Sequence, residues 1–248
     1  MIIDSHAHVV LPLEKQIEMM DSSGIDKTIL CSTLVHPEKS ETYEEFIQEM
    51  NVLNQVLNNE INPRDARLRA MEELKDAVTT FPDRFIGFGS VPLSSSSEQL
   101  NHWVAKIVND YKMKGLGEFT LGIGQIKLLE PVFQAANDYS SLPIWVHTFH
   151  PLNSNDIQEL FILTRKYPNV PVIYGHLGGI HWLQTIPLIK ETKNAYLDIS
   201  AFYTTYSLFL AIKELPEKTV FSSDFPYGDP FLNKLAVERH AGTLLLLV

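Results

Sequence analysis

The sequence predicts an α/β fold, a (β/α)8 TIM-like barrel in which residues 1–248 form a single domain. Short apolar runs alternate with stretches of helical period along the chain, and this alternation is typical of βαβ units. A chain of 248 residues also suits one barrel of this kind. Side chains of the types that bind metals stand at the ends of several predicted strands, where barrel enzymes carry their chemistry.

Eight short apolar runs predict the strands. They lie at residues 1–4, 27–32, 84–91, 113–119, 142–147, 170–175, 195–199 and 219–223, and the first continues in extended form to residue 8. Because strands joined through helices form right-handed units, the sheet is expected to be parallel. Eight such strands fit a closed barrel better than an open doubly wound sheet.

Apolar residues at helical spacing predict a helix after each strand and one additional helix after the second strand. The helices lie at residues 14–22, 40–59, 63–80, 97–111, 126–140, 155–167, 182–190, 206–215 and from 231 onward. Gly24 ends the first helix, because glycine adopts the left-handed conformation of a helix C-terminus without strain. Pro63 separates the additional helix from the next one, since the residue before a proline disfavours helical geometry.

The composition excludes several classes of partner. A formal net charge of −10 argues against binding to nucleic acid or to an anionic membrane, because both require clustered Lys and Arg. No apolar run is long enough to span a bilayer, and the apolar tail 244–248 is too short. No targeting signal is expected before the first strand. The single cysteine, Cys31, lies in an apolar run, so we expect a buried structural thiol in a cytoplasmic protein without an intramolecular disulfide.

The first apolar run leads into the residues Asp4-Ser5-His6-Ala7-His8. In an extended chain, side chains two residues apart point to the same face, so that Asp4, His6 and His8 are expected to lie together. Two imidazoles on one face form half of a metal site. Such a histidine pair is on its own more often a surface or capping feature, and the remaining ligands must therefore come from other strands.

Four further strands end in residues that bind metals in many proteins. These residues are Glu118, His147, His176 and Asp224, at the ends of the fourth, fifth, sixth and eighth strands. Each has an ordinary structural explanation when taken alone, but five coincident strand ends indicate one site.

The residue types at this site indicate hydrolytic metal chemistry. Neutral imidazoles and carboxylates suit zinc and the neighbouring first-row metals, and three or four protein ligands leave a position for water. A metal lowers the pKa of that water from near 16 toward roughly 7, which supplies hydroxide at neutral pH. A carboxylate that contacts both the metal and the water can take up the proton and return it to the leaving group, and Asp224 is the candidate for this base.

These residues, with the motifs Gly175-His176-Leu177-Gly178-Gly179 and Ser223-Asp224-Phe225-Pro226, resemble the amidohydrolase superfamily. Segments 81–88 and 196–200 extend the resemblance over nearly the whole chain. The most similar branch is the amidohydrolase-related group that includes aminocarboxymuconate-semialdehyde decarboxylase and several metal-dependent hydrolases.

The resemblance implies a single zinc ion held by His6, His8, His147 and Asp224. It implies that His176 orients or activates the bound water, or binds a second metal. Glu118 departs from the decarboxylase-like members and resembles the deoxyribonuclease-type members, in which this carboxylate helps to hold a metal pair. The expected cofactor is therefore one or two divalent ions, zinc or alternatively manganese or another first-row metal.

The leading interpretation is a metal-dependent hydrolase that uses a metal-activated water on a small-molecule amide, lactone or related carbonyl bond. Asp224 is expected to move the proton, and His176 to stabilise the developing charge. The alternatives are a non-oxidative decarboxylase of the same superfamily and a barrel that binds metal or ligand without turnover. The expected partner is a small-molecule substrate, and a homodimer is compatible with the sequence. Further candidates for the pocket wall are His36, His150, His181, Trp182 and Tyr203.

Overall fold

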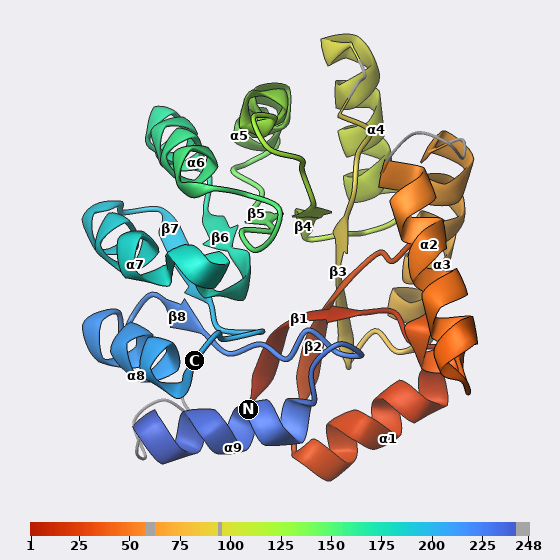
Figure 1. Cartoon of the computed structure of the whole chain (residues 1–248). Helices are drawn as coiled ribbons and strands as arrows, with labels where there is room; N and C mark the ends of the chain where they lie inside the picture. Colours follow the sequence, from red (N-terminus) through yellow and green to blue (C-terminus); the bar gives the residue numbers. More distant parts are fainter. Residues whose placement is uncertain (58–62, 94–95, 242–248) are drawn as a thin grey trace.

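In a computed structural model of the protein, which describes residues 1–57, 63–93 and 96–241, eight parallel strands form one sheet in the order β1 to β8. The strands are β1 Ile3–His8, β2 Lys27–Cys31, β3 Phe85–Gly89, β4 Gly115–Phe119, β5 Ile144–Val146, β6 Val172–Tyr174, β7 Ala195–Asp198 and β8 Thr219–Val220. Helices surround the sheet on its outer side (Figure 1). The predicted (β/α)8 barrel is confirmed.

The barrel closes between β1 and the chain that follows β8. The backbone N–H of Ser5 donates to the carbonyl of Phe221, and the N–H of Asp224 donates to the carbonyl of His6. Because the chain after Val220 bonds to β1 in this way, its regular pairing with β7 ends earlier than the predicted strand 219–223.

The helices occur where the sequence predicts them. They are α1 Leu13–Ser23, α2 Tyr43–Leu57, α3 Pro63–Thr80, α4 Ser97–Asn109, α5 Glu130–Asp138, α6 Ser154–Lys166, α7 Trp182–Glu191, α8 Thr205–Glu214 and α9 Pro230–Ala241. The short 3-10 helices are η1 Pro37–Lys39, η2 Ile126–Leu129 and η3 Gly175–His181. The predicted helix 126–140 is divided into η2 and α5, because Pro131 fits an α-helix only in its first turn. Residues 58–59 of the predicted helix 40–59 and the tail 244–248 lie outside the described residues.

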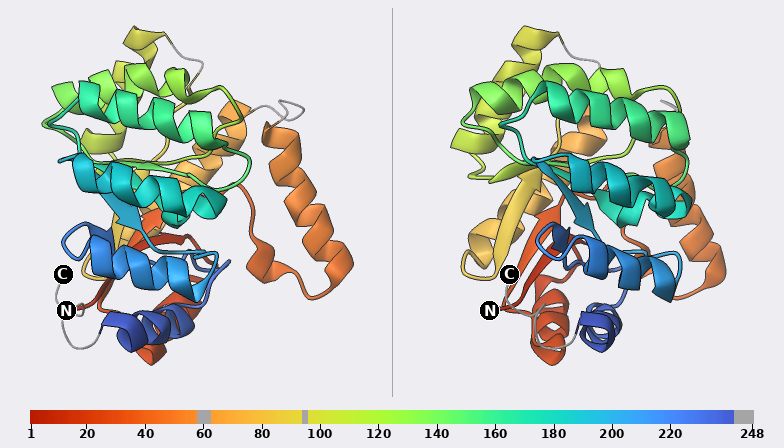
Figure 2. Two further views of the ribbon diagram at one scale, coloured as in Figure 1. Left: turned by 60° about the vertical axis from the view of Figure 1, so that its left-hand side comes forward. Right: turned by 90° about the vertical axis from the view of Figure 1, so that its left-hand side faces the viewer.

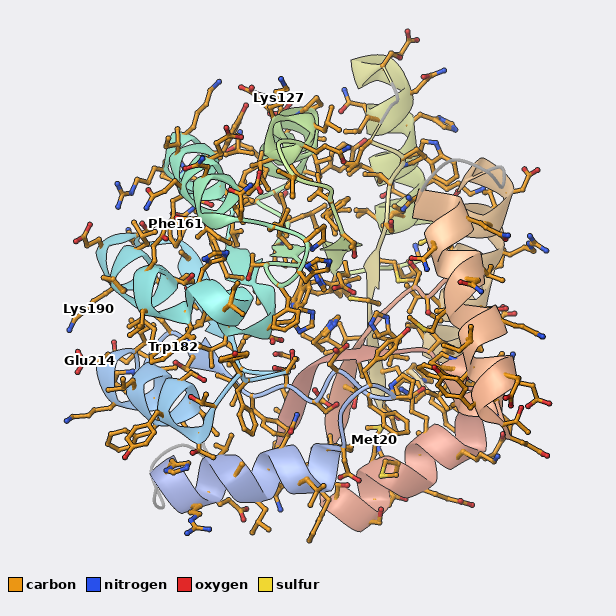
Figure 3. All side chains as sticks on the ribbon, viewed as in Figure 1. Met20, Lys127, Phe161, Trp182, Lys190 and Glu214 are labelled. Atoms are coloured by element: carbon orange, nitrogen blue, oxygen red, sulfur yellow. The ribbon has the colours of Figure 1, made fainter. Side chains whose placement is uncertain are left out.

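The core has two parts. The larger cluster of buried apolar residues packs the helices against the outer face of the sheet, and a smaller cluster of Cys31, Phe88, Trp145 and Ile173 forms a second group. Charged side chains such as Lys127, Lys190 and Glu214 point away from the barrel (Figure 3). Among the described residues, no helix has both the length and the apolar character needed to cross a membrane.

Helix α2 is an exception to this packing. Figure 2 shows that it stands away from the other helices. None of its side chains that the structure describes is buried, and Tyr43 is 73% exposed. The helix inserted after β2 therefore adds a wall beyond the barrel rather than a part of its core.

Asp4 joins the first and last strands. Its Oδ1 accepts hydrogen bonds from the backbone N–H groups of Ser223 (2.9 Å) and His6 (3.2 Å), and its Oδ2 accepts one from the Ser223 hydroxyl. Asp4 is buried, so these donors have no access to water as a replacement partner. Asp4 thus holds the residue that precedes Asp224, and it does not face the predicted metal ligands.

Replacing Asp4 with alanine is expected to lower the free energy of unfolding by about 3 kcal/mol, because two donors of Ser223 lose their carboxyl acceptor inside the protein. Urea denaturation followed by circular dichroism measures this change. Glu217→Ala, which removes an exposed carboxylate, is the control and should leave stability nearly unchanged. A loss below about 1 kcal/mol for Asp4→Ala would contradict the assigned closure role.

Candidate metal centre

The structure brings the six predicted ligand residues together at the C-terminal end of the barrel. His6 and His8 end β1, and Glu118 lies in β4. The other three residues lie just after β5, β6 and β8, within four residues of the strand ends, and they are His147, His176 and Asp224.

Two of these residues have an unusual backbone conformation. His176 and Asp224 have φ angles of 57° and 61°, in the left-handed region that residues other than glycine rarely adopt. Such a conformation persists only where surrounding contacts impose it, and it is frequent at functional sites. Both residues lie beyond the end of a strand, and their side chains line the cavity at the mouth of the barrel.

Glu118 lies between two pairs of histidines. Its Oε2 is 3.7 Å from Nε2 of His6 and 3.4 Å from Nε2 of His8. Its Oε1 is 2.8 Å from Nδ1 of His147 and 3.4 Å from Nε2 of His176. Each oxygen of the carboxylate therefore faces a different histidine pair.

Asp224 faces the first pair from the other side. Its Oδ1 lies 3.2 Å from Nε2 of His6 and 3.3 Å from Nε2 of His8. Its Oδ2 lies 3.9 Å from Nδ1 of His176. Asp224 thus shares His6 and His8 with Glu118, and the two carboxylates enclose these imidazoles.

The charges of the cluster stabilise one another. Burial alone would raise the pKa values of Glu118 and Asp224, but hydrogen bonds and charge interactions with the histidines hold both pKa values below their ordinary range. Burial opposes the charged form of His176, yet Glu118 and Asp224 raise its pKa to about 9. The nearby carboxylates of Asp224 and Glu118 likewise raise the pKa of His8 against the effect of burial. The carboxylates are therefore ionised at neutral pH, and the protonated form of His176 balances part of their charge.

The side chains beneath the cluster fix the position of His6. The ring of Trp145 stacks on the imidazole of His6 with 3.9 Å between ring centroids, and Sγ of Cys31 lies 3.6 Å from its Nδ1. A Cβ atom on residue 175 would lie 2.0 Å from the Trp145 ring, which is why Gly175 is required there. Burial raises the pKa of the Cys31 thiol well above its usual value, so that the thiol is an inert packing group.

His147 offers one particular ring nitrogen to the centre. Its Nε2 lies 3.0 Å from the carbonyl oxygen of His150, which can only accept a hydrogen bond. Nε2 therefore carries a hydrogen, and Nδ1 is the ring nitrogen that faces Glu118, 2.8 Å from its Oε1.

The arrangement fits a divalent cation. Nε2 of His6 and Oδ1 of Asp224 are buried and make no hydrogen bond among the described residues, although they are 3.2 Å apart. Buried polar atoms without a hydrogen bond are rare in proteins, and two such atoms close together form an arrangement that a shared cation satisfies. Three groups have ligand atoms within 4.8 Å of one another: His6, His176 and Asp224; His6, His8 and Glu118; Glu118, His147 and His176.

A cavity of about 400 Å³ opens beside the cluster, and His8, Glu118, His147, His176 and Asp224 contribute to its wall. The remainder of the wall is largely apolar and includes Leu34, Val35, Met50, Val91, Leu93, Phe119, Phe149 and Tyr227. Met50 comes from α2, so the inserted helix contributes to this cavity. Its size and lining suit a small, partly aromatic molecule with a few polar groups.

Arg67 of α3 also lines this cavity. Its guanidinium donates to the hydroxyl of Ser90, and it forms no ion pair with a carboxylate among the described residues. Burial lowers the pKa of Arg67, but an arginine remains charged at neutral pH. The cavity therefore contains a cation that faces the same space as the anionic cluster.

Arg67 was not among the residues predicted from the sequence. The sequence nevertheless contains a signal, because Arg67 precedes Ala70, Met71 and Leu74 at helical spacing and these three residues are buried. An arginine in the apolar stripe of a helix has to be directed at a buried polar partner or a cavity.

The other predicted wall residues do not line the cavity as the structure describes it. His36 lies 2.9 Å from a carboxylate oxygen of Glu38 and 2.9 Å from one of Glu73, which ties the loop after β2 to α3. Tyr203 is 60% exposed, and Trp182 packs against the main core. His150 contributes its backbone carbonyl to the site, through His147.

Comparison with known proteins identifies the family and the fold. A family model described as Amidohydrolase matches residues 3–235. No curated protein matches the chain in sequence.

Several solved structures share the fold. The 5-carboxyvanillate decarboxylase of Sphingomonas paucimobilis has a TM-score of 0.69 at 14% identity, with 100% of this chain and 96% of that chain covered. The 5-carboxyvanillate decarboxylase of Novosphingobium aromaticivorans, solved with manganese and 4-hydroxy-3-methoxy-5-nitrobenzoic acid, has a TM-score of 0.68 at 15% identity, covering 99% and 92%. A dihydroxybenzoic acid decarboxylase of a Polaromonas species, solved with manganese and 2-nitroresorcinol, has a TM-score of 0.63 at 17% identity, covering 97% and 91%.

Proposed function

Because the chain belongs to the amidohydrolase family, we propose that it is a metal-dependent, non-oxidative decarboxylase of small aromatic carboxylic acids. Three similar structures are of decarboxylases, and two of these contain manganese with a nitro-substituted aromatic ligand. This similarity favours the decarboxylase alternative over the hydrolase that the sequence suggested first.

The observation that carries the proposal is Arg67. Within the part of the chain that the structure describes, this guanidinium has no carboxylate partner, and its cavity also holds five predicted metal ligands. It is therefore suited to bind a carboxylate of the substrate through two parallel hydrogen bonds. The aromatic residues Phe119, Phe149 and Tyr227 give the same cavity a surface for a ring.

The cation would be held by His6, His8, His147 and Asp224, with Glu118 facing the three histidines. Imidazole and carboxylate ligands suit zinc or manganese. When bound, the metal would supply a Lewis acid that withdraws electron density from an oxygen of the substrate.

The protein's own residues would carry out the remaining steps. Decarboxylation breaks the bond between the ring carbon and the carboxylate, releases carbon dioxide and places a proton on that carbon. Arg67 would orient the acid, and the apolar wall would exclude water from the ring. Asp224, which is ionised at neutral pH, would take up a proton from the solvent and pass it to the carbon, while the positively charged His176 stabilises negative charge that develops beside it.

The direct test is an assay of carbon dioxide release from a panel of hydroxybenzoic acids, with protein loaded with Mn²⁺ or Zn²⁺. A parallel panel of amides and lactones tests hydrolysis. Release of carbon dioxide with retention of the ring supports the proposal, whereas hydrolysis of an amide or lactone without decarboxylation of any acid would reject it.

Glu118 keeps hydrolysis as a second candidate function. A carboxylate that presents one oxygen to each of two histidine pairs is suited to bridge two cations, and two-metal sites are frequent among hydrolases. Two bound metal ions would therefore favour hydrolysis as the reaction.

Replacing Glu118 with glutamine is expected to lower the affinity for Mn²⁺ at least about tenfold, because the substitution removes a negative charge that faces the histidine ligands. Competition with a chelator measures the affinity, and elemental analysis of the dialysed protein gives the number of ions bound. Glu130→Gln alters an exposed carboxylate that pairs with Lys166 and should leave both values unchanged. Unchanged affinity in Glu118→Gln would exclude this carboxylate from the metal centre.

A further inference from the structure

Two residues at the end of β7, Asp198 and Ser200, contact the predicted site without lining its cavity. Both are fully buried, with 0% of their surface exposed. They belong to the segment 196–200 that contributes to the family resemblance, but neither is among the predicted ligands.

Asp198 and Ser200 hold His176 at two points. Oδ1 of Asp198 accepts a hydrogen bond from the backbone N–H of His176 at 3.1 Å. Oγ of Ser200 lies 2.8 Å from Nδ1 of the His176 ring. The same Oδ1 of Asp198 also accepts the Ser200 hydroxyl at 2.5 Å and the Ser200 backbone N–H at 2.9 Å.

These contacts determine which atom carries each hydrogen. Oδ1 of Asp198 accepts two backbone N–H groups, so the hydrogen between it and Ser200 belongs to the serine hydroxyl. A serine has a single hydroxyl hydrogen, and Oγ therefore has only lone pairs left for the imidazole. Nδ1 of His176 must then donate its own hydrogen to Ser200.

Ser200 is itself held in place from the neighbouring strand. Its backbone N–H donates to Oγ of Ser222 at 2.9 Å, in the segment that leads from β8 to Asp224. This bond fixes the backbone of Ser200, and the hydroxyl cannot turn away from His176 without breaking its own bond to Asp198.

We propose that Asp198 and Ser200 are positioning residues that accept the hydrogen on Nδ1 of His176 and direct Nε2 toward the metal centre. Nε2 is the ring atom that lies 3.4 Å from Glu118 and 3.0 Å from His147. The inference rests on the proposed function only in assigning His176 to the reacting site. It holds equally for a decarboxylase and a hydrolase, since both require one defined nitrogen at the substrate or metal.

A purely structural role of Asp198 and Ser200 would not depend on the orientation of the His176 ring. The bond from the His176 backbone to Asp198 stabilises the left-handed turn at residue 176 whether or not the ring is oriented. Ser200→Ala separates the two roles, because it keeps Asp198 and its backbone bonds but removes the acceptor of the ring hydrogen.

The experiment is nitrogen-15 NMR of the full-length protein with labelled histidine rings, recorded without metal and with Zn²⁺. The His176 signals are assigned by their loss in His176→Asn. In the wild-type protein we expect a slowly exchanging hydrogen on Nδ1 of His176. In Ser200→Ala this signal should be lost, and Ser200→Thr, which restores a hydroxyl, should recover it.

Ser207→Ala is the matched control. It removes another fully buried serine hydroxyl, in the N-terminal capping box of α8, and should lower stability without changing the His176 signals. With an active substrate, Ser200→Ala should lower kcat about 10- to 100-fold, whereas Ser207→Ala should not.

Two results would overturn the proposal. One is the finding that His176 of the wild-type protein carries no hydrogen on Nδ1. This measurement does not depend on whether any variant folds. The other is an unchanged Nδ1 hydrogen in Ser200→Ala. Neither depends on the carbon dioxide assay, so failure of the proposed reaction and failure of this inference are distinguishable.

Discussion

Replacing Asp224 with asparagine is expected to lower kcat by roughly 1,000-fold or more, while part of the bound metal is retained. Asparagine has nearly the same shape as aspartate, so Oδ1 can still face Nε2 of His6 and His8. It cannot take up or deliver a proton near neutral pH, however, and it removes one negative charge from the centre. The loss should therefore appear mainly in turnover.

The measurement combines steady-state kinetics with elemental analysis of the same protein samples. Asp229→Asn is the matched control, because it lies in the same loop and caps α9 through Oδ1, an acceptor that asparagine keeps. Wild-type turnover in an Asp224→Asn protein would exclude Asp224 as the group that moves the proton. Complete loss of metal would instead show that its main role is as a ligand.

Replacing Arg67 with methionine is expected to lower kcat/KM for a carboxylic acid by about 100-fold, which corresponds to about 3 kcal/mol. Methionine retains an apolar stem but removes the guanidinium that is predicted to bind the acid in this cavity. Arg67→Lys should recover part of the loss, since lysine keeps the charge without the bidentate geometry.

Binding of a neutral analogue provides the internal comparison. A phenol that lacks the carboxylate should inhibit the wild-type and Arg67→Met proteins equally, because it makes no use of the guanidinium. Arg69→Met removes an exposed arginine from the same helix and should have no effect on kcat/KM. Equal kcat/KM values for wild type and Arg67→Met would remove the main support for a carboxylate substrate.

The barrel could be predicted from the sequence because its signals are local. Short apolar runs and helical periods depend on residues close in the chain, and Gly24 ends α1 in the left-handed conformation expected of it. The main differences between the predicted and the observed elements arise where contacts with residues distant in the sequence determine the structure. β8 is short because the chain beyond Val220 turns to β1, and no local pattern near residue 220 records that pairing.

The composition of the candidate site could be predicted because parallel strands all end at one edge. His147 and His176 are recognisable from their place after an apolar run. In the structure, Nδ1 of His147 lies 3.0 Å from Nε2 of His176. Arg67 could not be found by this rule, because it lies on a helix and enters the cavity through the arrangement of α3. The relation of Ser200 to His176 depends on the left-handed turn at residue 176, which is formed by tertiary contacts.

The closure between β1 and the segment after β8 links metal binding to the stability of the whole barrel. Asp4 and Ser223 are 219 residues apart in sequence, and each lies within two residues of a predicted ligand, His6 and Asp224. A cation shared by these ligands would hold together the two ends of the barrel. Any ion that binds the folded chain more tightly than the unfolded one raises the free energy of unfolding by an amount that grows with its concentration. The supply of metal would therefore set both how much of the protein is active and how long it resists unfolding and proteolysis.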